Sequence, residues 1–232
     1  MRARAGVTNV ARRPVVAVWK GGAIASPGED AVVAHVPVRD RRYLAARVIT
    51  EVFAPAVLVG AQLVAVGWHA GQVAGVSRWW GLLGALFAVV IPFAYVLRGI
   101  RHGGLVNHHI PDRERRRVPL LFGVASLGCG LVVLWALGAP RELLALLVAG
   151  GAGLLVFLTI THWWKISIHT GVAAGTVAVL VTVYGPVAFA ALPVVPLVGW
   201  ARLRLAAHTL AQVIVGAGVG ALVAALVFPS LR

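Results

Sequence analysis

Long apolar runs separated by short polar segments dominate the pattern of the 232-residue chain. Charged residues are absent between Leu143 and Ile160, from Val118 to Pro140, and from Leu210 to Leu231. Each run approaches the length, roughly 20 residues, that an α-helix needs to cross the hydrocarbon core of a bilayer. The pattern therefore predicts transmembrane helices at about 48–69, 79–98, 118–138, 142–162, 168–185, 187–200 and 208–228.

The expected fold is an all-α, polytopic bundle of six to seven transmembrane helices. The sixth predicted helix is short and is interrupted by Pro193 and Pro196, which membrane helices tolerate when neighbours satisfy the freed backbone groups. Gly216 and Gly220 form a GxxxG pair that allows close helix contact. This contact would form either within one chain or between two copies, so a homo-oligomer is one of two outcomes.

Composition agrees with a single membrane domain over residues 43–232. Hydrophobic residues make up 60% of the chain and charged residues 12%, whereas a soluble domain needs a more polar exterior. Residues 1–42 differ, because they are basic and lack the apolar core of a secretory signal. We expect a weakly ordered arm there, which either binds anionic headgroups or acts only as an orientation signal.

Basic residues flank the predicted helices unevenly. They precede the first helix and follow the second, fourth and sixth, whereas the opposite side carries only Arg78, Arg141 and Arg232. The positive-inside rule then places the amino terminus and the basic loops in the cytoplasm. The sequence thus predicts a multi-pass plasma-membrane protein whose partners are the bilayer and a lipid, and not a nucleic acid.

Three polar clusters interrupt the apolar pattern. Residues 107–119 read Asn-His-His-Ile-Pro-Asp-Arg-Glu-Arg-Arg-Arg-Val-Pro, residues 165–170 read Lys-Ile-Ser-Ile-His-Thr, and the third cluster comprises Arg202, His208 and Gln212. Two predicted helices separate each cluster from the next. Because an even number of crossings returns the chain to the same membrane face, we expect all three clusters to converge there.

These residue types suit phosphate binding and transfer. Guanidinium groups clamp phosphate oxygens, helix amino termini add N–H donors, and Ser167 can donate its hydroxyl proton. His169 and His208 can divide the work of nucleophile and proton donor. The last acidic residue of the chain is Glu142, so no carboxylate pair adjoins these histidines in the sequence to hold magnesium, and no metal or other cofactor is expected. Taken singly, each cluster also fits a solvated arginine loop, an interfacial histidine or snorkelling arginines.

These residues resemble the type 2 phosphatidic acid phosphatase family of membrane lipid phosphatases. The family's pattern is Lys-x6-Arg-Pro, then Pro-Ser-Gly-His, then Ser-Arg-x5-His-x3-Asp. The third element matches best, since five residues separate Arg202 from His208 and three more separate His208 from Gln212. The second element reads Ile-Ser-Ile-His and ends at His169, and the nearest match to the first is His109-x6-Arg-Arg. The resemblance covers roughly residues 107–228.

The resemblance implies a phosphatase that acts through a phosphohistidine and needs no metal. Its substrates would be lipid phosphates or diphosphates, of the isoprenyl or the glycerolipid class. His208 would attack phosphorus, His169 would protonate the leaving group, and Gln212 would take the place of the aspartate that orients the nucleophile. The phosphate would be bound by Arg202, Ser167, Arg116, Arg117, His109 and Lys165.

The sequence also departs from the family's pattern. Gln212 replaces the aspartate, Ile168 replaces the glycine of the second element, and the lysine of the first element is missing. A neutral amide accepts a hydrogen bond from an imidazole but cannot stabilise its charged form as a carboxylate does. The alternative is therefore a lapsed phosphatase that binds phospholipid or a partner protein. A small transporter is less favoured, because the predicted helix centres lack ionisable groups.

Overall fold

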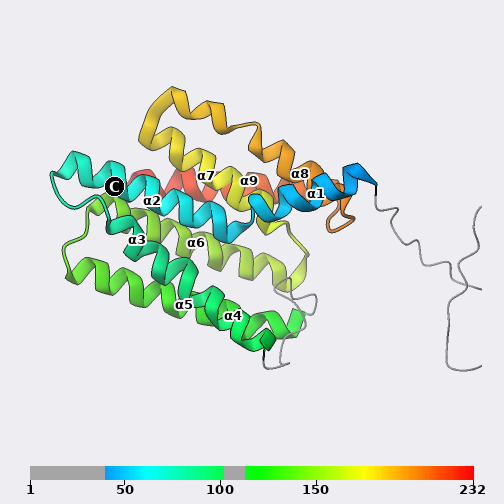
Figure 1. Cartoon of the computed structure of the whole chain (residues 1–232), viewed down its shortest axis with the longest axis horizontal. Helices are drawn as coiled ribbons and strands as arrows, with labels where there is room; N and C mark the ends of the chain where they lie inside the picture. Colours follow the sequence, from blue (N-terminus) through cyan, green and yellow to red (C-terminus); the bar gives the residue numbers. More distant parts are fainter. Residues whose placement is uncertain (1–39, 102–112) are drawn as a thin grey trace, which may run out of the picture. The chain divides into compact units, whose positions relative to one another are not determined.

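The computed structural model describes residues 40–101 and 113–232, the latter without the side chains of residues 113–117, 119 and 120. The expected amino-terminal arm and His109 therefore lie outside the described residues, apart from the last three residues of the arm. The described part is all-helical. Its elements in chain order are α1 (Arg41–Val52), α2 (Pro55–Ala74), α3 (Trp80–Ala85), the π-helical η1 (Leu86–Val90), α4 (Ile91–Arg101), α5 (Arg113–Ala136), α6 (Arg141–Trp163), α7 (Ile168–Tyr184), the 3-10 helix η2 (Gly185–Ala191), α8 (Val194–Arg204) and α9 (Leu210–Leu231) (Figure 1).

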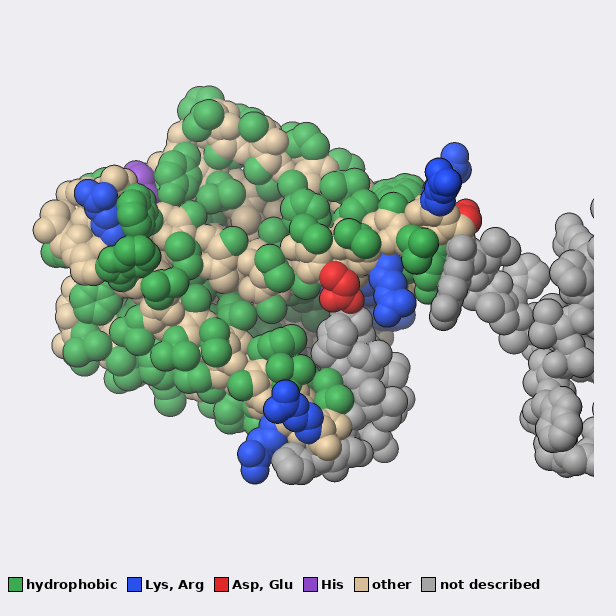
Figure 2. All heavy atoms as spheres, viewed as in Figure 1, with side chains coloured by type: hydrophobic (Ala, Val, Ile, Leu, Met, Phe, Trp, Pro, Cys, Tyr) green, Lys and Arg blue, Asp and Glu red, His purple; other side chains and the backbone are tan. Residues whose placement is uncertain are grey.

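Five helical segments of the described chain are long and apolar enough to cross a bilayer, fewer than the six to seven that the hydropathy pattern predicted. They span residues 55–74, 80–101, 141–163, 168–191 and 210–231, and α5 contributes a shorter apolar stretch, Leu121–Ala136. Hydrophobic side chains cover the visible face of the bundle, and the basic side chains gather near its ends (Figure 2). These features indicate a multi-pass membrane protein.

Exposed tryptophans mark the helix ends. Trp79 at the start of α3 and Trp135 at the end of α5 are exposed, as are Trp163 and Trp164 at the end of α6. Figure 1 shows that α3 begins where α5 ends, at the side of the bundle opposite to the end of α6. Tryptophan is enriched at both interfaces of a bilayer, where its amphipathic ring lies at headgroup level. The two groups are therefore consistent with a bundle that spans the membrane.

The first and sixth predicted helices differ from the structure. The predicted helix 48–69 is two helices, because the chain breaks after Val52 and α2 starts with Pro55 at its first position. Proline suits that position, since the first N–H groups of a helix have no intrahelical partner. The predicted helix 187–200 is replaced by η2 and the eleven-residue α8, with Pro193 at the junction. Proline lacks an N–H, so it ends the hydrogen-bonding pattern of the preceding helix.

The GxxxG pair contacts α7 of the same chain. Gly216 and Gly220 are both buried. A Cβ atom on Gly216 would lie 2.5 Å from the carbonyl oxygen of Ser167, and one on Gly220 would collide with the carbonyl oxygen of Gly171. These glycines therefore let the backbones of α7 and α9 approach closely. Of the two outcomes expected from the pair, packing within one chain is the one that the structure shows.

Candidate functional site

The second and third polar clusters meet where α7 and α9 begin. The backbone N–H of Ser167 donates to the carbonyl oxygen of Gln212 at 3.2 Å. The hydroxyl of Thr170 lies 3.0 Å from the carbonyl oxygen of Val213 and 3.1 Å from that of Ser167. The expectation that these two clusters lie at one end of the bundle is therefore confirmed, whereas the polar side chains of the first cluster lie outside the described residues. α7, η2 and α8 together make the return path between them.

Ser167 holds the start of α7. It is the N-cap residue, and its hydroxyl oxygen accepts from the backbone N–H of Thr170 at 3.5 Å. This bond satisfies one of the donors that every helix leaves open at its amino terminus. Ser167 and Thr170 are fully buried, and His169 between them is 9% exposed. The cap thus fixes the backbone that carries His169, a role that the sequence did not assign to Ser167.

His208 and Gln212 are joined by a hydrogen bond at the start of α9. Nδ1 of the histidine donates to Oε1 of the glutamine at 3.2 Å. The same oxygen accepts from the backbone N–H of Thr209 at 3.1 Å, and the Thr209 hydroxyl accepts from the Gln212 N–H at 3.4 Å. This is a capping box, which favours Glu or Gln at its third helical position. Gln212 therefore orients the histidine and caps the helix with one oxygen.

Arg202 lies near the end of α8 and is partly buried. Its Nε is buried and has no hydrogen-bond partner in the described part of the chain. Burial lowers the pKa of Arg202, and the charge of Glu51 in α1 opposes this effect. An arginine remains protonated in proteins. The site therefore contains a partly buried cation whose Nε–H has no acceptor within residues 40–101 and 113–232.

The short helix α1 supplies carboxylates that sequence reasoning did not assign to the site. Asp40 caps α1 by accepting from the Tyr43 N–H at 2.7 Å, and it forms an ion pair with Arg204 at 2.8 Å. The hydrogen bond from Tyr43, aided by Arg204, lowers the pKa of Asp40. Aspartate directly before a helical segment is a recognisable N-cap signal. Its pairing with Arg204, which is 164 residues away in the chain, cannot be predicted from a single sequence.

The remaining predicted residues within the described chain are Lys165, Arg116 and Arg117. Lys165 is exposed, beside the buried Ile166. Arg116 and Arg117 belong to the beginning of α5, where only the backbone is described. Across residues 40–101 and 113–232, no group of three His, Cys, Asp or Glu side chains is arranged to hold a metal ion.

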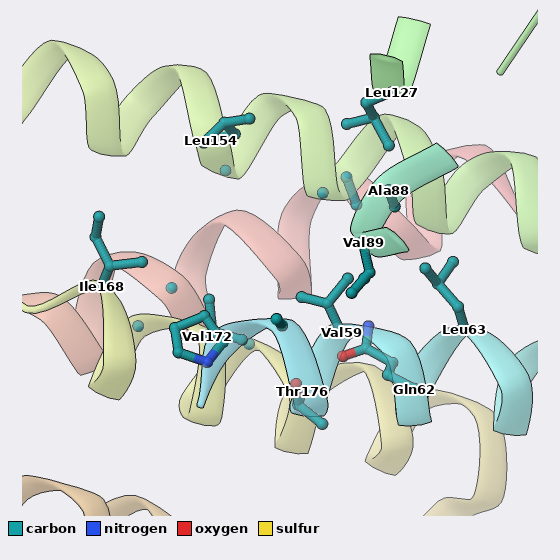
Figure 3. Close-up of a pocket in the computed structure, with 18 of the residues that line it drawn as sticks. Val59, Gln62, Leu63, Ala88, Val89, Leu127, Leu154, Ile168, Val172 and Thr176 are labelled. Atoms are coloured by element: carbon teal, nitrogen blue, oxygen red, sulfur yellow. The ribbon is translucent and has the colours of Figure 1, made fainter. Parts of the chain in front are cut away.

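An apolar cavity of about 380 Å³ lies among α2, η1, α4, α5, α6, α7 and α9 (Figure 3). Its lining includes Pro55 at the first position of α2 and Ile168 at the first position of α7, directly beside His169. Deeper in the cavity, Gln62 and Thr176 are the polar members of an otherwise hydrophobic and glycine lining. The lining therefore extends from the interior of the bundle to the first residues of α2 and α7, and His169, His208 and Arg202 are not part of it.

Comparisons with models of protein families, with curated proteins and with solved structures find no match to this chain.

Proposed function

We propose that this chain is a metal-independent phosphatase, with a fold like that of the type 2 phosphatidic acid phosphatases, that hydrolyses a lipid phosphate or diphosphate within the membrane. The observation that carries the proposal is the apolar cavity whose lining includes Ile168, the residue that precedes His169 in α7. A lipid phosphate has both parts that this arrangement suits, a charged head for the helix ends and a hydrocarbon chain for the cavity.

In the proposed reaction His208 is the nucleophile. Its Nδ1–H donates to Gln212, so the lone pair of the neutral ring resides on Nε2. Nε2 forms a bond to phosphorus while the bond between phosphorus and the lipid oxygen breaks. His169, in its protonated form, gives a proton to that oxygen. A water molecule then attacks phosphorus, the bond from phosphorus to nitrogen breaks, and His169 takes the proton from the water.

Binding of the phosphate rests on cations and N–H donors. The Nε–H of Arg202, which has no acceptor in the described part of the chain, supports a role for Arg202 in binding phosphate. A buried donor without an acceptor destabilises the protein, and a bound phosphate oxygen would remove this cost by accepting from it. The amino termini of α7 and α9 contribute positive dipole ends, which Ser167 and Thr209 hold in place through their caps. Lys165, His109, Arg116 and Arg117 remain proposed phosphate ligands.

The proposed site faces the cytoplasm. This follows from the positive-inside rule applied to the basic loops and from the basic amino-terminal arm. Its substrate would then come from the inner leaflet of the plasma membrane.

Phosphate release from short-chain lipid phosphates by the purified protein in detergent micelles tests the proposal. We expect release that persists in EDTA and disappears in His208→Ala. Gln72→Ala is a matched control, because Gln72 is an exposed side chain in α2 that does not line the cavity. Release that EDTA abolishes and magnesium restores would contradict the mechanism.

The lapsed phosphatase is the second candidate, and the neutral partner of His208 favours it. A carboxylate stabilises the charged ring that forms during phosphate transfer, whereas the Gln212 amide supplies only a neutral acceptor. A parent protein that binds lipid phosphate without releasing phosphate, together with an active Gln212→Asp variant, would establish this reading in place of the first.

A further inference from the structure

Gln62 is an unusual side chain for its location. It lies in the middle of α2, lines the cavity beside Val59 and Leu63, and makes no side-chain hydrogen bond within the described residues (Figure 3). The buried hydroxyl oxygen of Thr176, on the neighbouring α7, also lacks a partner in the described part of the chain. Polar side chains inside a membrane bundle normally form hydrogen bonds with neighbouring helices, because lipid hydrocarbon has no donors or acceptors. Two such groups in one cavity point to a ligand with a hydrogen-bonding group.

Both groups lie about two helical turns from the start of their own helices. α2 and α7 begin at the same end of the bundle and run side by side (Figure 1). Gln62 follows Pro55 by seven residues and Thr176 follows Ile168 by eight. At a rise of 1.5 Å per residue, they lie roughly 10 and 12 Å along their helices. A ligand anchored by its phosphate beside Ile168 would therefore meet both polar groups within this distance of its phosphate.

The two polar groups distinguish the two lipid classes left open above. An isoprenyl phosphate is pure hydrocarbon beyond its phosphate, so it would leave both polar side chains unsatisfied. An acyl glycerolipid carries an ester carbonyl just beyond its glycerol backbone, nearer to phosphorus than the depth of the Gln62 Cα. Because helical side chains tilt toward the amino terminus, the Gln62 amide extends toward this carbonyl. The Gln62 amide N–H₂ can donate to it. Threonine in a helix has two accessible χ1 rotamers, so the Thr176 hydroxyl can turn toward the same acceptor.

We propose that Gln62 is a specificity-determining residue that selects acyl glycerolipid phosphates over isoprenyl phosphates by hydrogen bonding to an ester carbonyl in the cavity. This inference rests on the proposed function, because it assumes that the phosphate end lies beside Ile168. One neutral hydrogen bond in a dry site corresponds to about a fivefold to tenfold preference for the lipid that satisfies it.

The test compares three lipids of matched chain length: a phosphatidic acid with ester links, its ether-linked analogue, and an isoprenyl phosphate. We expect the parent protein to favour the ester over the ether by about fivefold in kcat/KM. Gln62→Leu, which keeps the volume and removes the donor, should reduce this ratio to about one without slowing turnover of the isoprenyl phosphate. Gln72→Leu, an exposed change in the same helix, should leave every ratio unchanged.

Binding of the same three lipids, measured by native mass spectrometry, keeps the inference separate from the proposed function. Absence of phosphate release from any lipid would overturn the function, while the ester-to-ether binding ratio of parent and Gln62→Leu would still decide the role of Gln62. Equal binding and turnover of ester and ether by the parent would overturn the inference. An equal loss on all three lipids in Gln62→Leu would also overturn it, since that pattern indicates general disruption.

Discussion

Replacing Gln212 tests how His208 is oriented. Oε1 of Gln212 accepts from the histidine ring at 3.2 Å and from the Thr209 N–H at 3.1 Å, so one atom serves both the histidine and the helix cap. Gln212→Asp would supply a charged acceptor four residues after the histidine, the spacing of the family's pattern. Gln212→Leu would remove the acceptor and keep a side chain of similar size.

The expected magnitudes follow from these two bonds. A hydrogen bond to a charged group is worth about 1.5–3 kcal/mol and a neutral one about 0.5–1.5 kcal/mol, so the aspartate gains about 1 kcal/mol. If this gain acts on the charged ring in the transition state, kcat rises about fivefold. A carboxylate in the first turn of α9 also interacts favourably with the helix dipole, by about 0.3–1 kcal/mol. Gln212→Leu should lower kcat by about fivefold through loss of the neutral bond.

The assay is steady-state phosphate release from a short-chain lipid phosphate, with thermal unfolding measured on the same preparations. Thr209→Ala is the matched control, because it removes the cap hydroxyl and leaves the bond between His208 and Gln212. It should cost about 1 kcal/mol of stability with little change in kcat. Equal kcat in the parent, Gln212→Asp and Gln212→Leu would refute the view that this hydrogen bond orients the nucleophile.

Three further predictions follow from the packing, the charge pattern and the ion pair of α1. Gly220→Ala should lower the unfolding temperature, because its Cβ meets the backbone of α7 and overpacking typically costs about 1–3 kcal/mol, whereas Gly218→Ala, which meets nothing within 4 Å, should not lower it. With the single native cysteine replaced, a cysteine introduced at Lys165 should resist an impermeant reagent in intact cells and one at Arg141 should react; the reverse pattern would contradict a cytoplasmic site. The pKa of Asp40 is lowered below its ordinary value of 3.8. The stabilisation of α1 by the ionised Asp40 cap should therefore be fully present above pH 3.8 and should be lost as the pH falls through the lowered pKa. Hydrogen exchange of the α1 amides should show this acid-dependent loosening in the parent and not in Asp40→Asn, which should be loose throughout.

Hydropathy located most of the membrane helices because run length is a direct consequence of bilayer thickness. It missed α1 as a separate helix, since residues 41–52 mix arginines, a threonine and a glutamate with apolar side chains and lack a long apolar run. It also extended a helix across Phe53 and Ala54, where only Pro55 signals the break. The prolines of the sixth predicted helix already indicated that it would be interrupted, and the structure has η2 and α8 in its place.

The candidate site was predictable in its topology but not in its pairings. Counting crossings correctly brought the segment of His169 to that of His208, although η2 and the eleven-residue α8, and not a second full-length span, make the return path. The ion pair of Asp40 with Arg204 joins residues far apart in the chain, and only packing of α1 on α8 brings them together. The role proposed for Gln62 depends on the cavity that it lines, and residue spacing within a single helix does not reveal that cavity.

The most direct measurement of the central claim is detection of a phosphohistidine. The purified parent protein is mixed with a lipid phosphate labelled with ³²P and quenched within the first turnover. The account predicts label on the protein that survives alkali, is released by acid, maps by mass spectrometry to His208, and is absent from His208→Ala. Phosphate release by His208→Ala at the parent's rate, with no labelled protein in either sample, would contradict it.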